Sequence, residues 1–184
     1  MNLPSHFTLP MNSILTASGI YFSYTDPLPG QIFLSDIATS LGNTCRFRGQ
    51  CQFYSVAEHC VLGAALANDM DLMRAFLMHD SAEAYMGDPP TPLKVMLPDF
   101  LRIEALVESA IWGRFGMLCD RDDEVKRIDL MMRKTEHNFL FPDSPGLPEL
   151  RDVPFAYVDI KCWSPVEASG KFLELATNLG IEES

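Results

Sequence analysis

Positive charge is scarce in this sequence. Its 184 residues include 14 lysines and arginines but 25 aspartates and glutamates, so the net charge is −11. Nucleic-acid phosphates attract basic surfaces, and this balance therefore argues against DNA or RNA as a partner. An acidic protein that binds a phosphate needs local positive charge, either from a metal ion or from a few well-placed lysines and arginines. The chain is 47% hydrophobic, which suits a single compact domain over residues 1–184.

Long hydrophobic runs and paired cysteines are also missing. No stretch approaches the roughly 20 apolar residues of a membrane span, and the N-terminus lacks the basic start and apolar run of a signal peptide. The five cysteines are an odd number without a CxxC motif, which argues against a disulfide framework or a zinc ribbon. A small metal knot at Cys45, Cys51 and Cys60 is a minor alternative, because that spacing matches no standard zinc pattern. We therefore expect a cytoplasmic protein that does not associate with membranes.

Apolar spacing and capping signals predict a mostly helical chain with a short N-terminal β-hairpin. The strands of that hairpin are expected at 20–24 and 31–34, around a turn rich in proline and glycine. Prolines exclude helix between Gly87 and Pro98. The expected helices lie at about 35–41, 55–67, 69–85, 99–115, 120–139 and 164–180. The sequence thus predicts an all-α bundle of five or six helices.

Polar residues mark where several of these helices should begin. Ser35 or Asp36 can cap the first helix. Ser55 and Glu58 form a capping-box sequence, in which the Ser55 hydroxyl accepts the amide hydrogen of Glu58 and the Glu58 carboxylate reaches back. A second box of this kind begins at Ser164.

Four polar residues fall on or beside the apolar stripes of these helices: His59, His79, Asp80 and Asp129. A buried stripe normally holds Leu or Val, and burying an imidazole or a carboxylate there is costly unless the group is paired or binds a metal. Neutral imidazole and carboxylate suit zinc, manganese, iron or cobalt. Taken singly, each residue could instead be a hydrogen-bonded core histidine, a cap or an ion-pair partner. Because all four share this placement on three helices, we predict that they converge on one divalent cation.

The order of these four residues resembles that of the HD-domain metal-dependent phosphohydrolases. Residues 54–59, YSVAEH, resemble the first-histidine segment of the small HD enzymes. Residues 79–94, HDSAEAYMGDPPTPLK, resemble the second segment of 5′-deoxynucleotidases and of small phage deoxynucleoside triphosphohydrolases. The resemblance covers roughly residues 35–140 and implies an HD-type helical bundle, a divalent metal (Zn, Mn or Co) and a small-molecule deoxynucleotide as substrate.

The same resemblance implies roles for residues near the metal. Glu83 and Asp88 would activate water, protonate the leaving group or hold additional metal ions beside the phosphates, and Lys94 would contact phosphate. On a helix, Glu83 shares the face of His79, four residues earlier. A bound metal would lower the pKa of its water toward ~7. A solvated helix residue, a turn acid and a surface lysine are the plainer alternatives for these three residues.

Substrate contacts are also implied just before the first histidine helix. The deoxynucleotidases have a phosphate-contacting arginine there, followed by tryptophan. This sequence has Arg46 followed by Phe47, with Arg48 as a possible substitute for the arginine. Phe47 could stack on a base or ribose, or simply pack in the core. Arg133 lies four residues after Asp129 and is expected to pair with it along the helix.

The implied reaction is hydrolysis of a deoxynucleoside 5′-phosphate. Similarity to the compact phage enzymes favours a dNTP substrate such as dATP, with release of triphosphate. A 5′-deoxynucleotidase acting on dNMPs and a nucleotide-sensing module without turnover are the alternatives. Di-iron HD oxygenases use extra histidines before the last aspartate, whereas the other two histidines here are His6 and His137. We therefore expect one tightly held metal ion, and a homo-oligomer supported by the apolar surface left on the helices.

Overall fold

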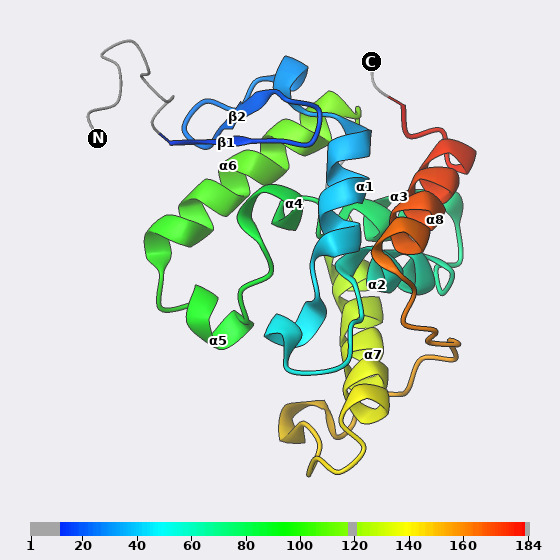
Figure 1. Ribbon diagram of the computed structural model, residues 1–184. Coiled ribbons are helices and arrows are strands. Elements are labelled where there is room, and N and C mark those ends of the chain that lie inside the picture. Colours follow the sequence, from blue (N-terminus) through cyan, green and yellow to red (C-terminus); the bar gives the residue numbers. More distant parts are fainter. Residues whose placement is uncertain (1–11, 118–120, 183–184) are drawn as a thin grey trace.

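The computed structural model describes residues 12–117 and 121–182, and it is mostly helical (Figure 1). The longer helices are α1 (Leu34–Asn43), α2 (Val56–Ala64), α3 (Met70–Met78), α6 (Pro98–Arg114), α7 (Asp122–Leu140) and α8 (Pro165–Asn178). Two single-turn helices lie between α3 and α6, namely α4 (Glu83–Met86) and α5 (Thr91–Lys94). Strands β1 (Ser13–Leu15) and β2 (Tyr21–Ser23) form a small antiparallel hairpin near the N-terminus. The predicted all-α class with a short hairpin is confirmed.

Helix α2 occupies the middle of the bundle. It packs against α1, α3, α7 and α8, and α1 in turn lies beside α8 (Figure 1). The helices approach closely where glycine has no side chain, because a Cβ at Gly63 of α2 would overlap the Phe76 ring and one at Gly42 of α1 would overlap the Ser169 hydroxyl. Side chains on the buried face of α2 therefore point into the interior, and His59 is one of them.

The hairpin uses a different partner strand from the one expected. Strand β2 falls within the predicted 20–24, but it pairs with Ser13–Leu15, so that Ser13 lies opposite Ser23. The segment expected as the second strand, 31–34, instead joins the 3₁₀ turn Pro29–Gln31 to the start of α1. Pro29 is the first residue of that turn, where its fixed φ suits a helical conformation and its missing N–H costs nothing.

The proline-rich segment after α4 also differs from expectation. Helix was excluded there, yet Thr91–Lys94 forms α5. Pro92 lies in the first turn, where a proline has no intrahelical hydrogen bond to lose. The Pro90 carbonyl accepts the amide hydrogens of Leu93 and Lys94, at 2.8 and 3.1 Å. The prediction was wrong because it treated every proline as an interior one.

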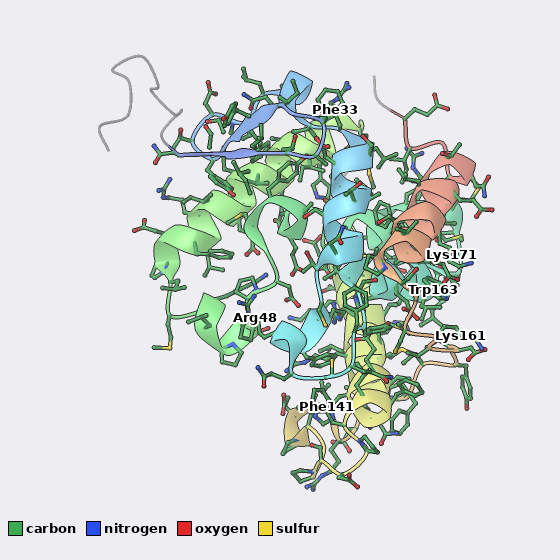
Figure 2. The ribbon with its side chains drawn as sticks, in the orientation of Figure 1. Phe33, Arg48, Phe141, Lys161, Trp163 and Lys171 are labelled. Carbon is green, nitrogen blue, oxygen red and sulfur yellow. The ribbon has the colours of Figure 1, made fainter. Side chains whose placement is uncertain are left out.

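The start of α1 is not set by a polar cap. Phe33 occupies the N-cap position, without a side-chain hydrogen bond (Figure 2). The buried Asp36 carboxylate instead accepts the amide and hydroxyl hydrogens of Ser18, at 2.7 and 2.8 Å. The predicted cap at Ser35 or Asp36 is therefore wrong, and Asp36 ties the β1–β2 turn to α1.

The described residues include no helix that is both long and apolar enough to cross a membrane. His6, Cys119 and Asp120 lie outside the described residues, and Asp120 is the expected first residue of the helix predicted at about 120–139.

Candidate metal centre and its pocket

His59 is fully buried on α2, and its ring is oriented through Nδ1. Its Nδ1 lies 2.6 Å from Oε1 of Glu136, and its Nε2 lies 3.4 Å from Nε2 of His79. A carboxylate only accepts, so the Nδ1–H of His59 donates to Glu136. The lone pair on Nε2 is then available to a metal ion.

His79 and Asp80 lie where α3 ends. The helix expected over 69–85 stops at Met78, and the amide hydrogens of Ser81 and Glu83 donate to carbonyls three residues earlier, at 3.0 and 2.9 Å. On one continuous helix, His79 and Asp80 would point about 100° apart. The helix instead ends earlier than predicted, and tight turns with hydrogen bonds between residues three apart follow it.

The second histidine is oriented by the main chain. Nδ1 of His79 lies 2.6 Å from the Phe76 carbonyl oxygen, to which its N–H donates. The Nε2 lone pair of His79 is therefore also available to coordinate a metal ion. This atom lies 3.2 Å from Oδ1 of Asp80. Oδ2 of the same carboxylate lies 3.7 Å from Nε2 of His59.

The group His59, His79 and Asp80 could hold a metal ion, because one ligand atom from each lies within 4.8 Å of the others. Its chemistry fits a divalent transition metal, since two imidazoles expose Nε2 and a carboxylate faces them. Among the described residues this is the one such group, and it contains no cysteine. Asp129 on α7 brings Oδ1 to 3.3 Å from Nε2 of His59. The four residues singled out in the sequence are thus neighbours in space.

Glu136 was missed by the sequence reasoning. It is fully buried, accepts the Tyr54 hydroxyl hydrogen at 2.8 Å and lies 3.2 Å from Nε of Arg46, in addition to its bond with His59. A signal was present, because Glu136 follows Asp129 by seven residues, which is two helical turns and hence the same face. A carboxylate behind a ligating histidine fixes the tautomer and the ring orientation.

Buried charges shift the pKa values of these groups. Burial opposes ionisation of Glu136, but the charges of Arg46 and His59 hold its pKa below the usual value. Burial and Arg46 likewise oppose charge on His59, yet Glu136 and Asp129 outweigh them and raise its pKa to about 9. His59, His79 and Arg46 also lower the pKa of Asp129 against the effect of burial. A metal ion would therefore have to displace a proton from His59.

Arg46 lies among the carboxylates of the centre. Its guanidinium is 3.4 Å from Oδ2 of Asp80 and 3.9 Å from Oδ1 of Asp129, and its side chain is only 11% exposed. Arg48 is exposed and donates to the Asp88 carbonyl at 3.2 Å. The contacts of Arg46 and Arg48 with a substrate phosphate remain predictions.

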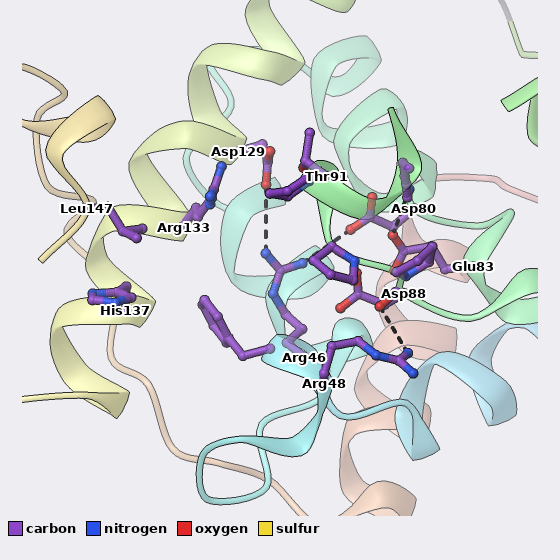
Figure 3. A pocket seen from close by; sticks show the side chains of 15 residues that line it. Arg46, Arg48, Asp80, Glu83, Asp88, Thr91, Asp129, Arg133, His137 and Leu147 are labelled. Atoms are coloured by element: carbon purple, nitrogen blue, oxygen red, sulfur yellow. Dashed lines mark hydrogen bonds and ion pairs between the residues drawn. The ribbon is translucent and has the colours of Figure 1, made fainter. Parts of the chain in front are cut away.

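A pocket of about 270 Å³ opens beside the centre (Figure 3). All of the predicted residues except the two histidines line it, namely Arg46, Phe47, Arg48, Asp80, Glu83, Asp88, Lys94 and Asp129. Arg133 lines it as well, but it pairs with Glu149 at 3.2 Å. No ion pair between Arg133 and Asp129 forms within the part of the chain that the structure describes, which corrects that expectation.

The acidic side of the pocket is strongly desolvated. Burial, followed by the charge of Asp80, raises the pKa of Glu83 well above the usual value, and burial also raises the pKa of Asp88. Nζ of Lys94 lies 2.7 Å from Oε1 of Glu104 and 3.6 Å from Oε1 of Glu83. The pocket thus places the Glu83 carboxyl group, which retains a proton to higher pH than usual, close to the Lys94 ammonium group.

Fold and site together define a mostly helical protein with a His–His–Asp group able to hold a metal ion, in which His59 is fully buried and the other two residues are partly buried. The chain is 38% identical over 172 residues to the uncharacterized protein YfdR of Escherichia coli, covering 92% of this chain and 96% of YfdR. It is also 33% identical over 120 residues to the uncharacterized protein RCAP_rcc00048 of Rhodobacter capsulatus, covering 60% of this chain and 61% of that protein. No family model matches the chain. The protein belongs to the family of YfdR.

Proposed function

We propose that the protein is a divalent-metal-dependent phosphohydrolase acting on deoxynucleoside 5′-phosphates, with dNTPs of the dATP type as preferred substrates and triphosphate as product. One observation carries the proposal. The Nε2 atoms of His59 and His79 face each other and the Asp80 carboxylate, at the edge of a pocket that also holds lysine and arginine side chains. Zinc, manganese or cobalt suits this donor set.

The residues of the pocket fit phosphoryl transfer to water. A divalent ion bound at the histidines would supply Lewis acidity. Glu83 keeps a proton to higher pH than an ordinary glutamate, which suits it to protonate a leaving oxygen. Lys94 and Arg48 offer positive charge to the phosphate oxygens. Glu83 and Asp88 are also placed to hold additional ions by their oxygen atoms.

The test is a screen of all deoxynucleoside mono-, di- and triphosphates with zinc, manganese and cobalt, with the products separated by chromatography. Triphosphate release supports the preferred substrate class, whereas phosphate release from dNMPs alone replaces it by a 5′-deoxynucleotidase. If no nucleotide is hydrolysed with any metal, the protein is a nucleotide-sensing module instead. Sedimentation of the same preparation measures whether it is the homo-oligomer that we also propose.

Two variants connect the activity to the centre. Asp80→Ala should abolish turnover and reduce the bound metal measured by elemental analysis. Asp71→Ala changes an exposed aspartate in the first turn of α3 and should leave both quantities unchanged. Full activity of His79→Ala would overturn the proposal.

A further inference from the structure

Three rings meet at the end of the pocket that lies away from Glu83. Phe47 and Phe141 have ring centroids 5.4 Å apart, and His137 lies 5.1 Å from Phe141 and 6.4 Å from Phe47. His137 and Leu147 lie at this end in Figure 3, and Phe141 is labelled in Figure 2. We call Phe47, His137 and Leu147, which line the pocket, and Phe141, which packs against the first two rings and lines only a neighbouring hollow, the aromatic end.

These side chains border open space and do not fill the core. All four are only partly buried. The pocket beside the metal centre lies against Phe47, His137 and Leu147. A second hollow of about 340 Å³ lies against His137, Phe141 and Leu147. Ordinary core packing would instead surround these rings with protein atoms.

The backbone holds Phe47 in an unfavourable conformation. Its φ is +53° and that of Arg48 is +57°, the left-handed region that non-glycine residues avoid. The segment is fixed on both sides, since the Arg46 amide donates to the Tyr54 carbonyl at 2.9 Å and the Gln50 amide to the Phe47 carbonyl at 3.1 Å. Conformational strain of this kind concentrates at ligand-binding positions, and here it accompanies a phenylalanine ring that faces α7.

The aromatic end and the metal centre lie at different positions along α7. Asp129 and His137 are eight residues apart on α7, which corresponds to about 12 Å along the helix axis. Arg133 lies between them and lines the same pocket. A nucleotide has its phosphate and its base at opposite ends, with the sugar between them. The pocket has matching chemistry, with cations and metal ligands at one end and aromatic faces at the other.

We infer that the aromatic end binds the base of the nucleotide by stacking. The inference rests on the proposed function for the position of the phosphate. Every base has a π-face, so stacking tolerates all four bases. The site therefore selects a nucleotide over a sugar phosphate without a base, and purines, which offer the larger face, gain most.

The test measures binding and turnover separately. Deoxyadenosine, which has no phosphate, is titrated into the protein in excess chelator, and its binding is followed by saturation-transfer NMR. His137→Ala should weaken binding by roughly 5- to 150-fold, the range expected for loss of one stacked base. Phe141→Leu, which keeps an apolar side chain of similar size, should weaken it less. The matched control is Phe139→Ala, because Phe139 is 48% exposed on the same helix and lines neither hollow.

Hydrolysis gives the second readout. His137→Ala should raise the KM for dNMP or dNTP, while hydrolysis of the base-free counterpart, 2-deoxyribose 5-phosphate for dNMP or 2-deoxyribose 5-triphosphate for dNTP, stays unchanged. Equal kcat/KM for nucleotides and the base-free ester in the wild type would overturn base binding and leave the phosphohydrolase proposal standing. Deoxyadenosine binding that His137→Ala weakens, in a protein without turnover, would support the base site and overturn the hydrolase. Equal deoxyadenosine affinity in the wild type and His137→Ala would overturn the base site whatever the turnover.

Discussion

Two glutamates, Glu58 and Glu136, are both fully buried, but they bind different kinds of partner. Glu58 precedes His59 on α2 and accepts the backbone amide hydrogens of residues 161–163, at 2.8, 2.9 and 2.7 Å. Glu136 contacts side chains of the candidate metal centre. Burial raises the pKa of Glu58 and outweighs the three amide hydrogen bonds that lower it, whereas the charges of Arg46 and His59 outweigh burial and lower the pKa of Glu136. The partners of a buried carboxylate therefore identify its role, and burial alone does not.

The largest expected effect of a change at this pair is on metal binding. Glu136→Gln removes the negative charge that orients His59 and should weaken metal affinity roughly 10–100-fold, as is typical for a carboxylate behind a ligating histidine. Titration of the chelated protein with zinc or manganese measures it. Glu58→Gln is the matched control and should bind metal like the wild type. Equal losses in the two variants would remove the distinction between the two glutamates.

The next largest effect is on stability. Glu58→Ala leaves three amides without their shared acceptor and should lower the free energy of unfolding by roughly 2–4 kcal/mol, because hydrogen bonds to a charged group are worth more than neutral ones. Urea denaturation measures the change. The folded variant should keep the metal content of the wild type. A loss of metal at unchanged stability would assign Glu58 to the centre instead.

Part of the site and its surroundings could be predicted from the sequence alone. Polar residues on apolar stripes were visible in the sequence, and His59 and Asp129 indeed lie 3.3 Å apart. The Ser55 hydroxyl accepts the Glu58 amide hydrogen at 3.0 Å, as predicted. The other half of that capping box was wrong, because the Glu58 carboxylate binds a segment about 100 residues later in the chain.

Long-range partners also explain the other errors. Helix α3 ends at Met78, and helical spacing alone does not reveal that His79 and Asp80 meet His59 of α2. The partner of β2 could not be read from local pattern, because both strands have only three residues. Glu136 lies in a helix rich in charged residues, where one more glutamate predicts an exposed position. Spacing from Asp129 marks it only once that aspartate is assigned to the site.

A smaller effect on stability and metal affinity is expected from a change at Tyr54, which contacts Glu136. Tyr54 is fully buried, and its hydroxyl donates to Oε1 of Glu136 at 2.8 Å. Tyr54→Phe removes that donor but leaves Glu136 its contacts with His59 and Arg46. We expect a loss of about 0.5–1.5 kcal/mol in unfolding free energy, and a fall in metal affinity smaller than that of Glu136→Gln. A larger fall would make the hydroxyl the main support of Glu136.

The smallest effect is expected at Asp69, an exposed carboxylate that contrasts with both buried ones. Its side chain accepts the Leu72 amide hydrogen at 2.8 Å as the cap of α3, and it pairs with Arg121 at 2.9 Å. These two contacts lower its pKa, the hydrogen bond from Leu72 most. The stabilisation is therefore complete above the unfolded pKa of about 3.9 and is lost as pH falls through the lower folded value.

Asp69→Asn separates the two contributions, because asparagine caps a helix about as well as aspartate but carries no charge. At pH 6 the variant should melt a few degrees below the wild type. As pH falls toward 3, this difference in melting temperature should shrink, because protonation removes the charge from the wild type as well. Thermal melts at several pH values measure it. A difference that stays constant with pH would mean that Asp69 stabilises α3 through its cap geometry alone, and that charge contributes only at the buried carboxylates.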